Sequence, residues 1–219
     1  MPFDPIIEPL LRSHKLPVYI EELNTYYEEE KKKRQFFYDG LTDDIKAEFI
    51  EGEVVIHSPA NNRHLEVSNF LSRLLSIYVD KYDLGSVKTE KALMRLSRND
   101  FEPNICFFRK EKTATFQNKT LHFPAPDFIV EILSDTTEKR DRGVKFKDYA
   151  LHGVMEYWII DAEAEIIEQY LLEGDQYVLH KKTNDGSISS RAVEGFTIPV
   201  NAVFNKEKNM LAIRGILTK

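Results

Sequence analysis

The chain has 219 residues, 42% of them hydrophobic and 11% aromatic, with a formal charge of −6. One cysteine, Cys106, excludes an intrachain disulfide framework and a cysteine zinc cluster. The acidic balance excludes a generic nucleic-acid coat, which would be basic overall, but not an enzyme with an acidic metal site and a local basic face.

No apolar run approaches the roughly 18 residues needed to span a bilayer, so no membrane partner is expected. The first residues lack the basic start and long apolar stretch of a secretory signal. We therefore expect a cytoplasmic protein.

The N-terminal region is expected to be an arm followed by a helix. Residues 1–16 have no clear period and are rich in proline, whereas residues 18–39 show a helical pattern. The charge run EEEKKKR within that helix places opposite charges three or four residues apart, which is typical of a solvated helix face.

A hairpin and an amphipathic helix follow. Two short alternating runs, AEFI and EVVIH, flank Glu51-Gly52 and predict a β-hairpin. Asn61 is a candidate N-cap for a helix over 62–81, whose apolar positions recur with a period near 3.6. His64 lies at the beginning of this helix.

The rest of the chain alternates between strands and one further helix. Strands are predicted over 87–96, 102–109, 126–133 and 155–161, with a turn at Asn99-Asp100, a helix over 138–151 ended by Gly153, a hairpin around EGD at 173–175, and short strands beyond. This order favours a mixed α/β core in which the helices at 62–81 and 138–151 pack on a central sheet.

The strand 126–133 carries two acids. Asp127 and Glu131 are four residues apart, an even offset, so they share one face of a regular strand with Ile129. Phe128, Val130 and Ile132 take the other face. An acid inside an apolar strand is costly to bury unless it binds a cationic group, so Glu131 is the first candidate for chemistry.

The following helix places Asp141, Lys145 and Tyr149 on one polar stripe, at i, i+4 and i+8. Its cations could meet a phosphate backbone; they are Lys139, Arg140, Arg142, Lys145 and Lys147. The alternative is a solvent-exposed helix whose charges are paired internally by its own acids, Glu138, Asp141 and Asp148.

These elements together outline a metal-dependent phosphodiesterase site. It would combine Glu131, the end of a second strand near Pro103-Asn104, and Lys145 reaching in from the helix. Mg²⁺ prefers hard oxygen ligands, and a lysine can neutralise developing charge.

Four segments give the chain a resemblance to a known family. They are EGE at 51–53, His64, EPNICFF at 102–108, and the long block PDFIVEILSDTTEKRDRGVKFKDYALHGVMEYWIID at 126–161. With these, residues 45–180 resemble the Uma2 family of restriction endonucleases, formerly a domain of unknown function, in the PD-(D/E)xK nuclease superfamily.

The resemblance implies a restriction-endonuclease-like mixed β-sheet core flanked by helices, with an N-terminal helical arm over 1–44, a nuclease-like domain over 45–219 and a β-rich C-terminal tail. It also implies an endonuclease that uses Mg²⁺ or Mn²⁺ and acts on nucleic acid, with DNA as the expected substrate.

The resemblance assigns roles by position. Glu131 corresponds to the acid of the (D/E)xK element, and Leu133 stands where the motif's lysine would be. Lys145 from the next helix is the expected replacement for that lysine. The expected supporting residues are Asp127, Asp141, Tyr149, His64, and either Glu51 or Glu53.

One position departs from the family pattern. The family usually has Pro-Asp where this chain has Pro103-Asn104. Asn104 offers the metal a neutral carbonyl oxygen in place of a carboxylate, which should weaken metal binding. Glu102, expected on the same strand face, is a candidate to compensate.

Two alternatives to an active nuclease remain open. Asn104 is consistent with a nuclease fold that binds nucleic acid without cutting it. A homodimeric interaction protein could use exposed aromatic anchors, although a place in the core is the simpler expectation for them; these are Phe108, Tyr157, Trp158, Tyr170 and Tyr177.

Overall fold

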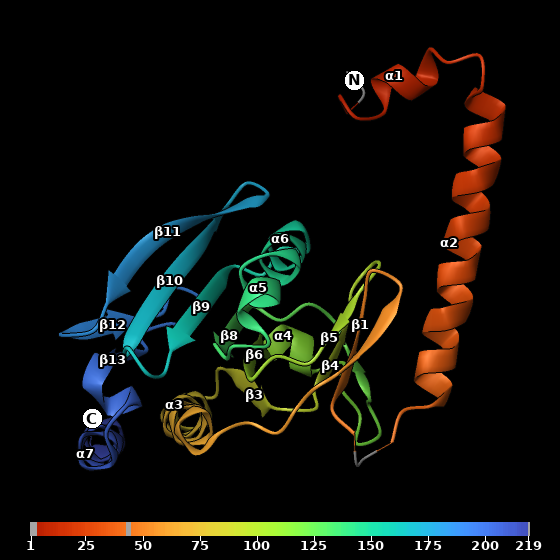
Figure 1. The fold of residues 1–219 in the computed structure, drawn as a ribbon. Coiled ribbons are helices and arrows are strands. Elements are labelled where there is room, and N and C mark those ends of the chain that lie inside the picture. The colour runs from red at the N-terminus through yellow and green to blue at the C-terminus, as the bar shows by residue number, and fades with distance from the viewer. Residues whose placement is uncertain (1–3, 43–44, 219) are drawn as a thin grey trace.

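The structure is a computed structural model that describes residues 4–42 and 45–218. Figure 1 shows a long N-terminal helix standing beside a layered α/β body. The helices are α1 (Glu8–Leu11), α2 (Leu16–Asp39), α3 (Asn62–Lys81), α4 (Lys110–Thr113), α5 (Glu138–Asp141), α6 (Val144–Leu151), the 3-10 helix η1 (Val200–Val203) and α7 (Lys206–Thr218).

The strands form three sheets. The six-stranded sheet has the order β11-β10-β9-β8-β6-β3, the five-stranded sheet β2-β1-β5-β4-β7, and β12 pairs with β13. The strands are β1 (Ala47–Ile50), β2 (Glu53–Ile56), β3 (Gly85–Thr89), β4 (Leu93–Arg95), β5 (Asp100–Phe101), β6 (Ile105–Arg109), β7 (His122–Phe123), β8 (Phe128–Ile132), β9 (Glu156–Asp161), β10 (Ile166–Glu173), β11 (Gln176–Thr183), β12 (Ser187–Ser189) and β13 (Thr197–Pro199).

The six-stranded sheet is buried on both faces, as an α/β core requires. On one face, Phe128, Val130 and Ile132 pack against α3, η1 and α7. On the other face, Ile129 packs with Tyr149 of α6 and with the five-stranded sheet. The predicted division of β8 into two faces and the packing of both helices on this sheet are confirmed.

The C-terminal half of α2 is fixed to the body by ion pairs with buried carboxylates. Both oxygens of Asp100 accept hydrogen bonds from Arg34, at 2.6 and 2.8 Å. Glu30 accepts from Arg98 at 2.8 and 2.9 Å. Phe37 is buried against Phe49 of β1. A bidentate pair with a fully buried carboxylate holds the helix in one orientation.

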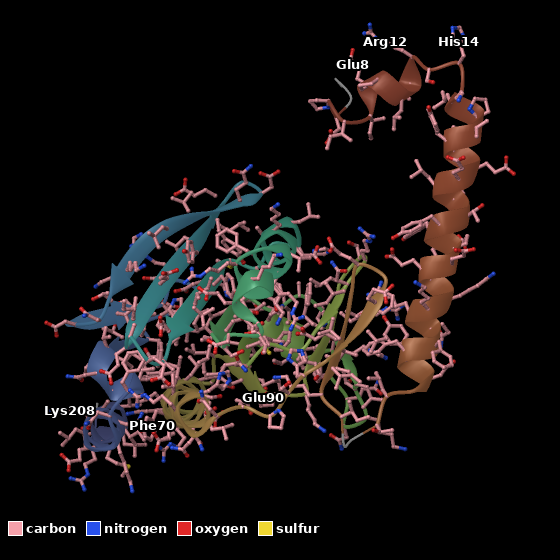
Figure 2. The ribbon with its side chains drawn as sticks, in the orientation of Figure 1. Glu8, Arg12, His14, Phe70, Glu90 and Lys208 are labelled. Atoms are coloured by element: carbon pink, nitrogen blue, oxygen red, sulfur yellow. The ribbon has the colours of Figure 1, made fainter. Side chains whose placement is uncertain are left out.

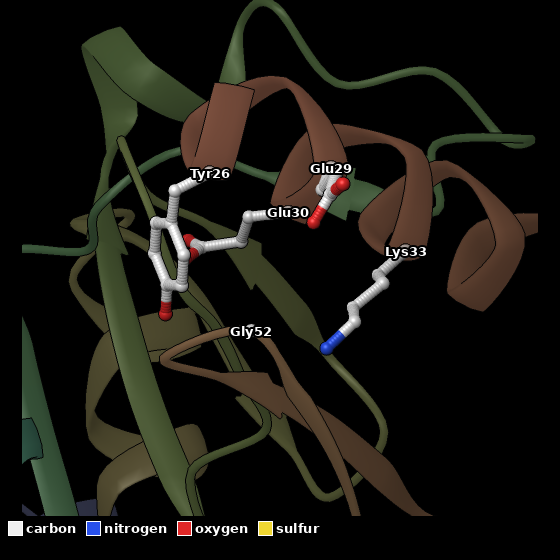
Figure 3. A pocket seen from close by; sticks show the side chains of 5 residues that line it. All are labelled: Tyr26, Glu29, Glu30, Lys33 and Gly52. Atoms are coloured by element: carbon white, nitrogen blue, oxygen red, sulfur yellow. The ribbon is translucent and has the colours of Figure 1, made fainter. Parts of the chain in front are cut away.

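A small pocket, of about 30 Å³, marks this junction (Figure 3). It is lined by Tyr26, Glu29, Glu30 and Lys33 of α2 and by Gly52 in the turn between β1 and β2. Gly52 has φ +88°, and a Cβ there would lie 3.3 Å from Glu30 Oε2. The turn therefore favours glycine both for its backbone conformation and for its approach to α2.

Several predicted elements match the structure. The helices predicted over 18–39 and 62–81, the first hairpin, the strand over 155–161 and the EGD hairpin are all present. The Asn61 side chain accepts from the His64 backbone N–H at 2.8 Å and caps α3 as expected.

Other elements differ from the sequence prediction. The single strand expected over 87–96 is two strands in different sheets, because Glu90 and Lys91 adopt positive φ and turn the chain between them. Asp100, expected in a turn, begins β5 and pairs with Phe49 and Arg95. The strand expected from residue 102 begins at Ile105, so Glu102 lies in the preceding loop and not on a strand face.

Two further predictions, the helix over 138–151 and the β-rich tail, also need correction. The helix expected over 138–151 is broken at Gly143 into α5 and α6. The tail is β-rich only as far as Pro199 and then ends in the helix α7, whose Ile213 and Ile216 are buried. Among the described residues, no helix combines the length and the apolar character needed to cross a membrane.

Candidate active site

Lys145 is the centre of a buried charged cluster between the two large sheets. Its side chain is 2% exposed, and its Nζ lies 2.9 Å from Glu48 Oε1 and 2.9 Å from Glu131 Oε1. Asp141 Oδ1 is 3.4 Å away. Burial alone would lower the pKa of Lys145, but these three carboxylates raise it well above its usual value, so the ammonium is charged.

The break at Gly143 positions Lys145. A Cβ at residue 143 would lie 2.6 Å from the carbonyl oxygen of Lys139, a distance that only glycine avoids. The kink turns α5 and α6 so that Asp141, Lys145 and Tyr149 all remain buried on one side. The solvent-exposed alternative for this helix is therefore wrong for its central stripe, although Lys139 and Lys147 are exposed.

Glu131 is held by three donors. Its Oε1 accepts from Lys145 at 2.9 Å and from the Tyr149 hydroxyl at 3.0 Å, and its Oε2 accepts from the Asn104 backbone N–H at 3.3 Å. The pKa of Glu131 is raised to about 7, chiefly by burial and also by the carboxylates of Asp141 and Glu48, against the opposing effect of Lys145.

Glu48 of β1 is a site residue that the sequence analysis missed. It is fully buried and accepts from the Glu102 backbone N–H at 2.8 Å as well as from Lys145. His57 Nε2 lies 3.0 Å from Glu48 Oε2, without the orientation of a hydrogen bond. Burial opposes ionisation of Glu48, but Lys145 and His57 hold its pKa down to about 2.

A signal for Glu48 was present in the sequence. It is an acid inside the short apolar run AEFI, the same feature that indicates Glu131 within PDFIVEIL. The family resemblance instead assigned a supporting role to Glu51 or Glu53 of the EGE segment. Both lie at the exposed tip of the hairpin, and Glu53 pairs with Lys33 of α2 at 3.1 Å. The structure therefore does not place Glu53 in the cluster.

Asn104 lies in the loop before β6, with its side chain fixed in one orientation. Its Oδ1 accepts from the Ile132 backbone N–H at 2.8 Å, and its Nδ2 lies 3.2 Å from His64 Nε2 and 3.4 Å from Glu90 Oε1. If the Asn104 amide oxygen and nitrogen were exchanged, the amide N–H groups would face the Ile132 backbone N–H, and two donors would meet. The His64 ring nitrogen therefore accepts, and burial lowers the His64 pKa, which favours the neutral ring.

Asp127 lies at the other end of β8 from Glu131. Its Oδ2 accepts from the Arg109 backbone N–H at 2.8 Å, and its Oδ1 pairs with Lys112 at 3.1 Å. Four residues of extended strand separate the two acids by about 13 Å. Sharing a strand face did not bring Asp127 into the cluster, and its contacts are structural.

The charges of the cluster fit an additional cation. Glu48, Glu131 and Asp141 surround one buried ammonium, and Glu102 is a fourth buried acid beside them. One oxygen each of Glu48, Glu102 and Asp141 accepts no hydrogen bond, although Glu48 Oε2 lies 3.0 Å from His57 Nε2 and Asp141 Oδ1 lies 3.4 Å from Lys145 Nζ. The pKa of Glu102 is raised to about 7, chiefly by burial, which Lys46 only partly offsets, and also by the carboxylate of Glu48. Carboxylate oxygens are the ligands that Mg²⁺ prefers.

The geometry, however, is not that of a closed metal cage. Over residues 4–42 and 45–218, no three side chains of His, Cys, Asp or Glu are grouped so that they could hold a metal ion. Lys145 occupies the space between Glu48 and Glu131 that a cation would share. The donor set fits a hard cation held by few protein ligands and several waters, as is usual for Mg²⁺.

Comparison with known proteins finds related sequences and related solved structures. Over 134 residues, covering 60% of this chain and 75% of the relative, the chain is 28% identical to an uncharacterized protein of Synechocystis, sll1609. A second uncharacterized Synechocystis protein, slr1290, is 24% identical over 147 residues, covering 64% and 74% of the two chains.

A crystal structure from Anabaena variabilis, described as "a putative nuclease belonging to DUF820", superposes with a TM-score of 0.66 at 16% identity. It covers 77% of this chain and 94% of its own. At this identity the likeness supports the fold, which is the mixed α/β nuclease-like architecture expected from the sequence.

The family model named Uma2 and described as "Putative restriction endonuclease" matches residues 34–201. That range contains β1, α3, β8 and α6, the elements that carry Glu48, His64, Glu131 and Lys145. The chain belongs to the Uma2 family of restriction-endonuclease-like proteins.

Proposed function

We propose that the protein is an endonuclease that hydrolyses phosphodiester bonds with the help of Mg²⁺ or Mn²⁺, with DNA as its substrate. One observation supports the proposal most directly: the single buried ammonium of Lys145 lies within 3.4 Å of three carboxylates, those of Glu48, Glu131 and Asp141. Family membership gives the reaction class, and this excess of negative charge gives a reason for a metal.

Glu131, Glu102 and the second lone pair of the Asn104 carbonyl oxygen would hold the ion. When bound, it would polarise the phosphodiester group and lower the pKa of a water molecule. The chain's own groups have separate tasks. Tyr149 and Asn104 fix the Glu131 carboxylate by donating to its two oxygens. Lys145 supplies positive charge where the phosphate becomes more negative.

Cations near the cluster support a phosphate-containing substrate. Lys46 forms an ion pair with Glu90, which is itself within reach of the Asn104 amide. Lys46 and Lys91 both lower the pKa of Glu102, so their positive potential extends into the site. Such cations beside an acidic centre can hold a phosphate backbone next to the metal.

Cleavage of DNA by the purified protein tests the proposal. Plasmid and linear DNA would be incubated with Mg²⁺ or Mn²⁺, with a chelator, and with the variants Glu131→Ala and Lys145→Ala. We expect metal-dependent cleavage by the parent protein that falls at least about 100-fold in each variant. Equal cleavage by all three proteins would reject the assignments.

Asn104 favours a second candidate, a nuclease fold that binds nucleic acid without cutting it. Its Oδ1 already accepts from Ile132, and the residue is neutral where a carboxylate is usual in the family. A binding assay with DNA in the absence of cleavage would support this function. Efficient cleavage by the parent protein would exclude it.

A further inference from the structure

The turn from β4 to β5 lies between α2 and α6, the helix that carries Lys145. Residues 97–101 contact both helices, and their contacts alternate between the two. Figure 2 shows side chains filling the space between the C-terminal half of α2 and the body, whereas the N-terminal half of the helix stands clear. The segment 97–101 therefore connects α2 to the helix that carries Lys145.

Two residues of the turn hold the C-terminal end of α6. The Ser97 backbone N–H donates to His152 Nε2 at 3.0 Å. The side-chain amide of Asn99, a residue that is 4% exposed, donates to Asp148 Oδ2 at 2.7 Å. Residues 145, 148 and 152 are spaced i, i+3 and i+7, so these contacts are made on the side of α6 that carries Lys145.

The next odd-numbered residue, Phe101, contacts the site residues themselves. Its ring lies edge-on to the Tyr149 ring, with 5.3 Å between the two centroids. Lys145 Nζ lies 5.7 Å from the centroid of the same Phe101 ring. Residues 97, 99 and 101 thus contact α6 in order, from its C-terminal end towards Lys145.

The even-numbered residues of the segment bind α2 instead. Arg98 pairs with Glu30, and the Asp100 carboxylate accepts from Arg34 at 2.6 and 2.8 Å. The Arg34 guanidinium also donates to the backbone carbonyl oxygens of residues 96, 97 and 99, at 2.8 to 3.2 Å. Because a guanidinium carries five donors in a rigid fork, one arginine of α2 fixes the backbone of the whole turn.

Asn99 also joins the turn to the hairpin that carries Glu48. Its Oδ1 accepts from the Glu51 backbone N–H at 2.7 Å, in the turn between β1 and β2. One end of the amide thus holds the hairpin, and the other end holds Asp148 of α6. The amide is therefore a second link, beside the ion pair between Glu48 and Lys145, between the same two elements.

The helix α6 needs such a link because it is short. Its eight residues, Val144–Leu151, follow the break at Gly143. A helix of about two turns derives its stability from tertiary contacts and not from its own hydrogen bonds. A rotation of α6 about that break would move the Lys145 ammonium away from Glu48 and Glu131, and a displacement of about 1 Å can cost about 100-fold in rate.

We propose that Asn99 is a positioning residue of the candidate active site. It fixes the Lys145 ammonium against Glu48, and α2 supports it by holding the backbone of its turn through Arg34. The inference rests on the proposed nuclease function, because Lys145 is the group that Asn99 places. It gives α2 an indirect part in the site, through the turn.

A double-mutant cycle in thermal unfolding, with chelator present, tests the proposal without any need for cleavage. Asn99→Ala should lower Tm in the parent protein, and this loss should be smaller by at least about one third in a Glu48→Gln background. The reason is that the ion pair aligned by Asn99 is already weakened there.

The matched control for the cycle is Asn209→Ala. Asn209 of α7 is fully buried, and its amide donates at 2.9 Å to the backbone carbonyl oxygens of Phe70 and Ala202. It joins α7 to α3 and η1, so the Tm loss should be the same with and without Glu48→Gln. Asn209→Ala should also leave kcat within about 2-fold of the parent value.

Exchange of the two linked side chains tests the hydrogen bond itself. In Asn99→Asp alone, two carboxylates face each other, so kcat should fall at least about 10-fold while KM stays within about 2-fold. In Asn99→Asp/Asp148→Asn, position 99 still offers an acceptor to the Glu51 backbone N–H, and the amide introduced at position 148 donates to it. This variant should return kcat to within about 3-fold of the parent value.

The contribution of α2 is tested by Arg34→Lys, which keeps the positive charge but loses the fork of donors to the turn. Its Tm loss should also shrink in the Glu48→Gln background. Arg73→Lys is the control, because the Arg73 guanidinium contacts only the Asn69 carbonyl oxygen of its own helix among the printed hydrogen bonds of the described residues.

Equal Tm losses from Asn99→Ala in the two backgrounds would overturn the proposal. An exchange variant that keeps the low kcat of Asn99→Asp would overturn it as well, and additive losses for Arg34→Lys would remove α2 from it. A parent protein that does not cleave DNA would refute the nuclease function, whereas the thermal cycle would still decide whether Asn99 aligns Lys145 with Glu48.

Discussion

Glu48 and Lys145 approach from two different structural layers and meet at 2.9 Å. Glu48 comes from β1 of the five-stranded sheet, and Lys145 comes from α6, which packs on the six-stranded sheet. Their ion pair is nearly inaccessible to water, so it links the N-terminal hairpin to the nuclease-like core through the centre of the candidate active site. The contact brings β1 into the candidate active site, which its position in the sequence does not suggest.

The first prediction compares Glu48 with Glu53, the residue to which the sequence analysis assigned a supporting role. Glu48→Gln removes one carboxylate from Lys145 and should lower DNA cleavage at least about 100-fold, as Glu131→Gln should. It should also lower the free energy of unfolding by about 1 to 3 kcal/mol, because a buried charge loses a partner. Glu53→Gln, at the exposed hairpin tip, is the control for both cleavage kinetics and chemical denaturation. A similar loss in Glu53→Gln would contradict the assignment of Glu48.

The second prediction concerns Asn104. In Asn104→Asp a carboxylate oxygen replaces the side-chain amide donor that faces Glu90 and His64. Without metal this adds repulsion, so Tm in chelator should fall by about 4 °C or more, for a cost of about 2 kcal/mol. Added Mg²⁺ should raise Tm more in the variant than in the parent protein. Differential scanning fluorimetry with a Mg²⁺ titration measures both effects, and no difference in the Mg²⁺ response would count against a metal at this position.

The third prediction is a pH dependence of stability from Glu168. Burial disfavours its ionised form, but hydrogen bonds from Arg142, Lys182 and Tyr170 bring its pKa down from 4.5 to about 2. A carboxylate whose pKa is lowered on folding stabilises the folded state above pH 4.5, and this contribution is lost as pH falls towards 2.

Glu168→Gln should therefore lower the free energy of unfolding by about 1 to 2 kcal/mol at neutral pH, less than the full pKa shift implies, because Arg142 and Lys182 are partly exposed to water. The difference should narrow as pH falls below about 4.5 and nearly vanish towards pH 2. Urea denaturation at several pH values measures it. Glu138→Gln, at the half-exposed partner of the same arginine, is the control, and a pH-independent difference for Glu168→Gln would refute the linkage.

The fourth prediction concerns Glu156, a fully buried carboxylate at the start of β9. It accepts five hydrogen bonds, at 2.6 to 2.8 Å, from Trp158 Nε1, Gln169 Nε2, the Ser190 hydroxyl and the backbone N–H groups of Arg191 and Ala192. In Glu156→Gln an amide N–H₂ group, which is itself a donor, replaces one of the two accepting oxygens and faces other donors. The free energy of unfolding should therefore fall by about 2 to 4 kcal/mol. The matched substitution Glu165→Gln, at an exposed turn, should cost less than about 0.5 kcal/mol. Thermal and urea unfolding of the two variants would show the contrast.

The exposed-aromatic route to a dimer is not supported by the structure. Phe108, Tyr157 and Trp158 are fully buried, and Tyr177 is 9% exposed. Tyr170 packs edge-on against Phe146. These side chains belong to the core.

The sequence by itself determined the elements whose signals are local. Apolar periodicity defined α3 and its Asn61 cap, alternation around Glu51-Gly52 defined the first hairpin, and an acid within an apolar strand identified Glu131. The i, i+4 and i+8 spacing correctly grouped Asp141, Lys145 and Tyr149, even though Gly143 interrupts the helix, because all three side chains still turn to one side.

Tertiary structure alone decided which distant groups meet. The pairing of Glu48 with Lys145 depends on the packing of two sheets, and the positive φ values at Glu90 and Lys91 that separate those sheets have no strong local signal. Asp127 shares a strand face with Glu131, yet it lies at the opposite end of β8 and accepts a hydrogen bond from the Arg109 backbone N–H there. Local spacing fixes the direction of a side chain, whereas burial of a charge depends on the partners that the whole chain brings to it.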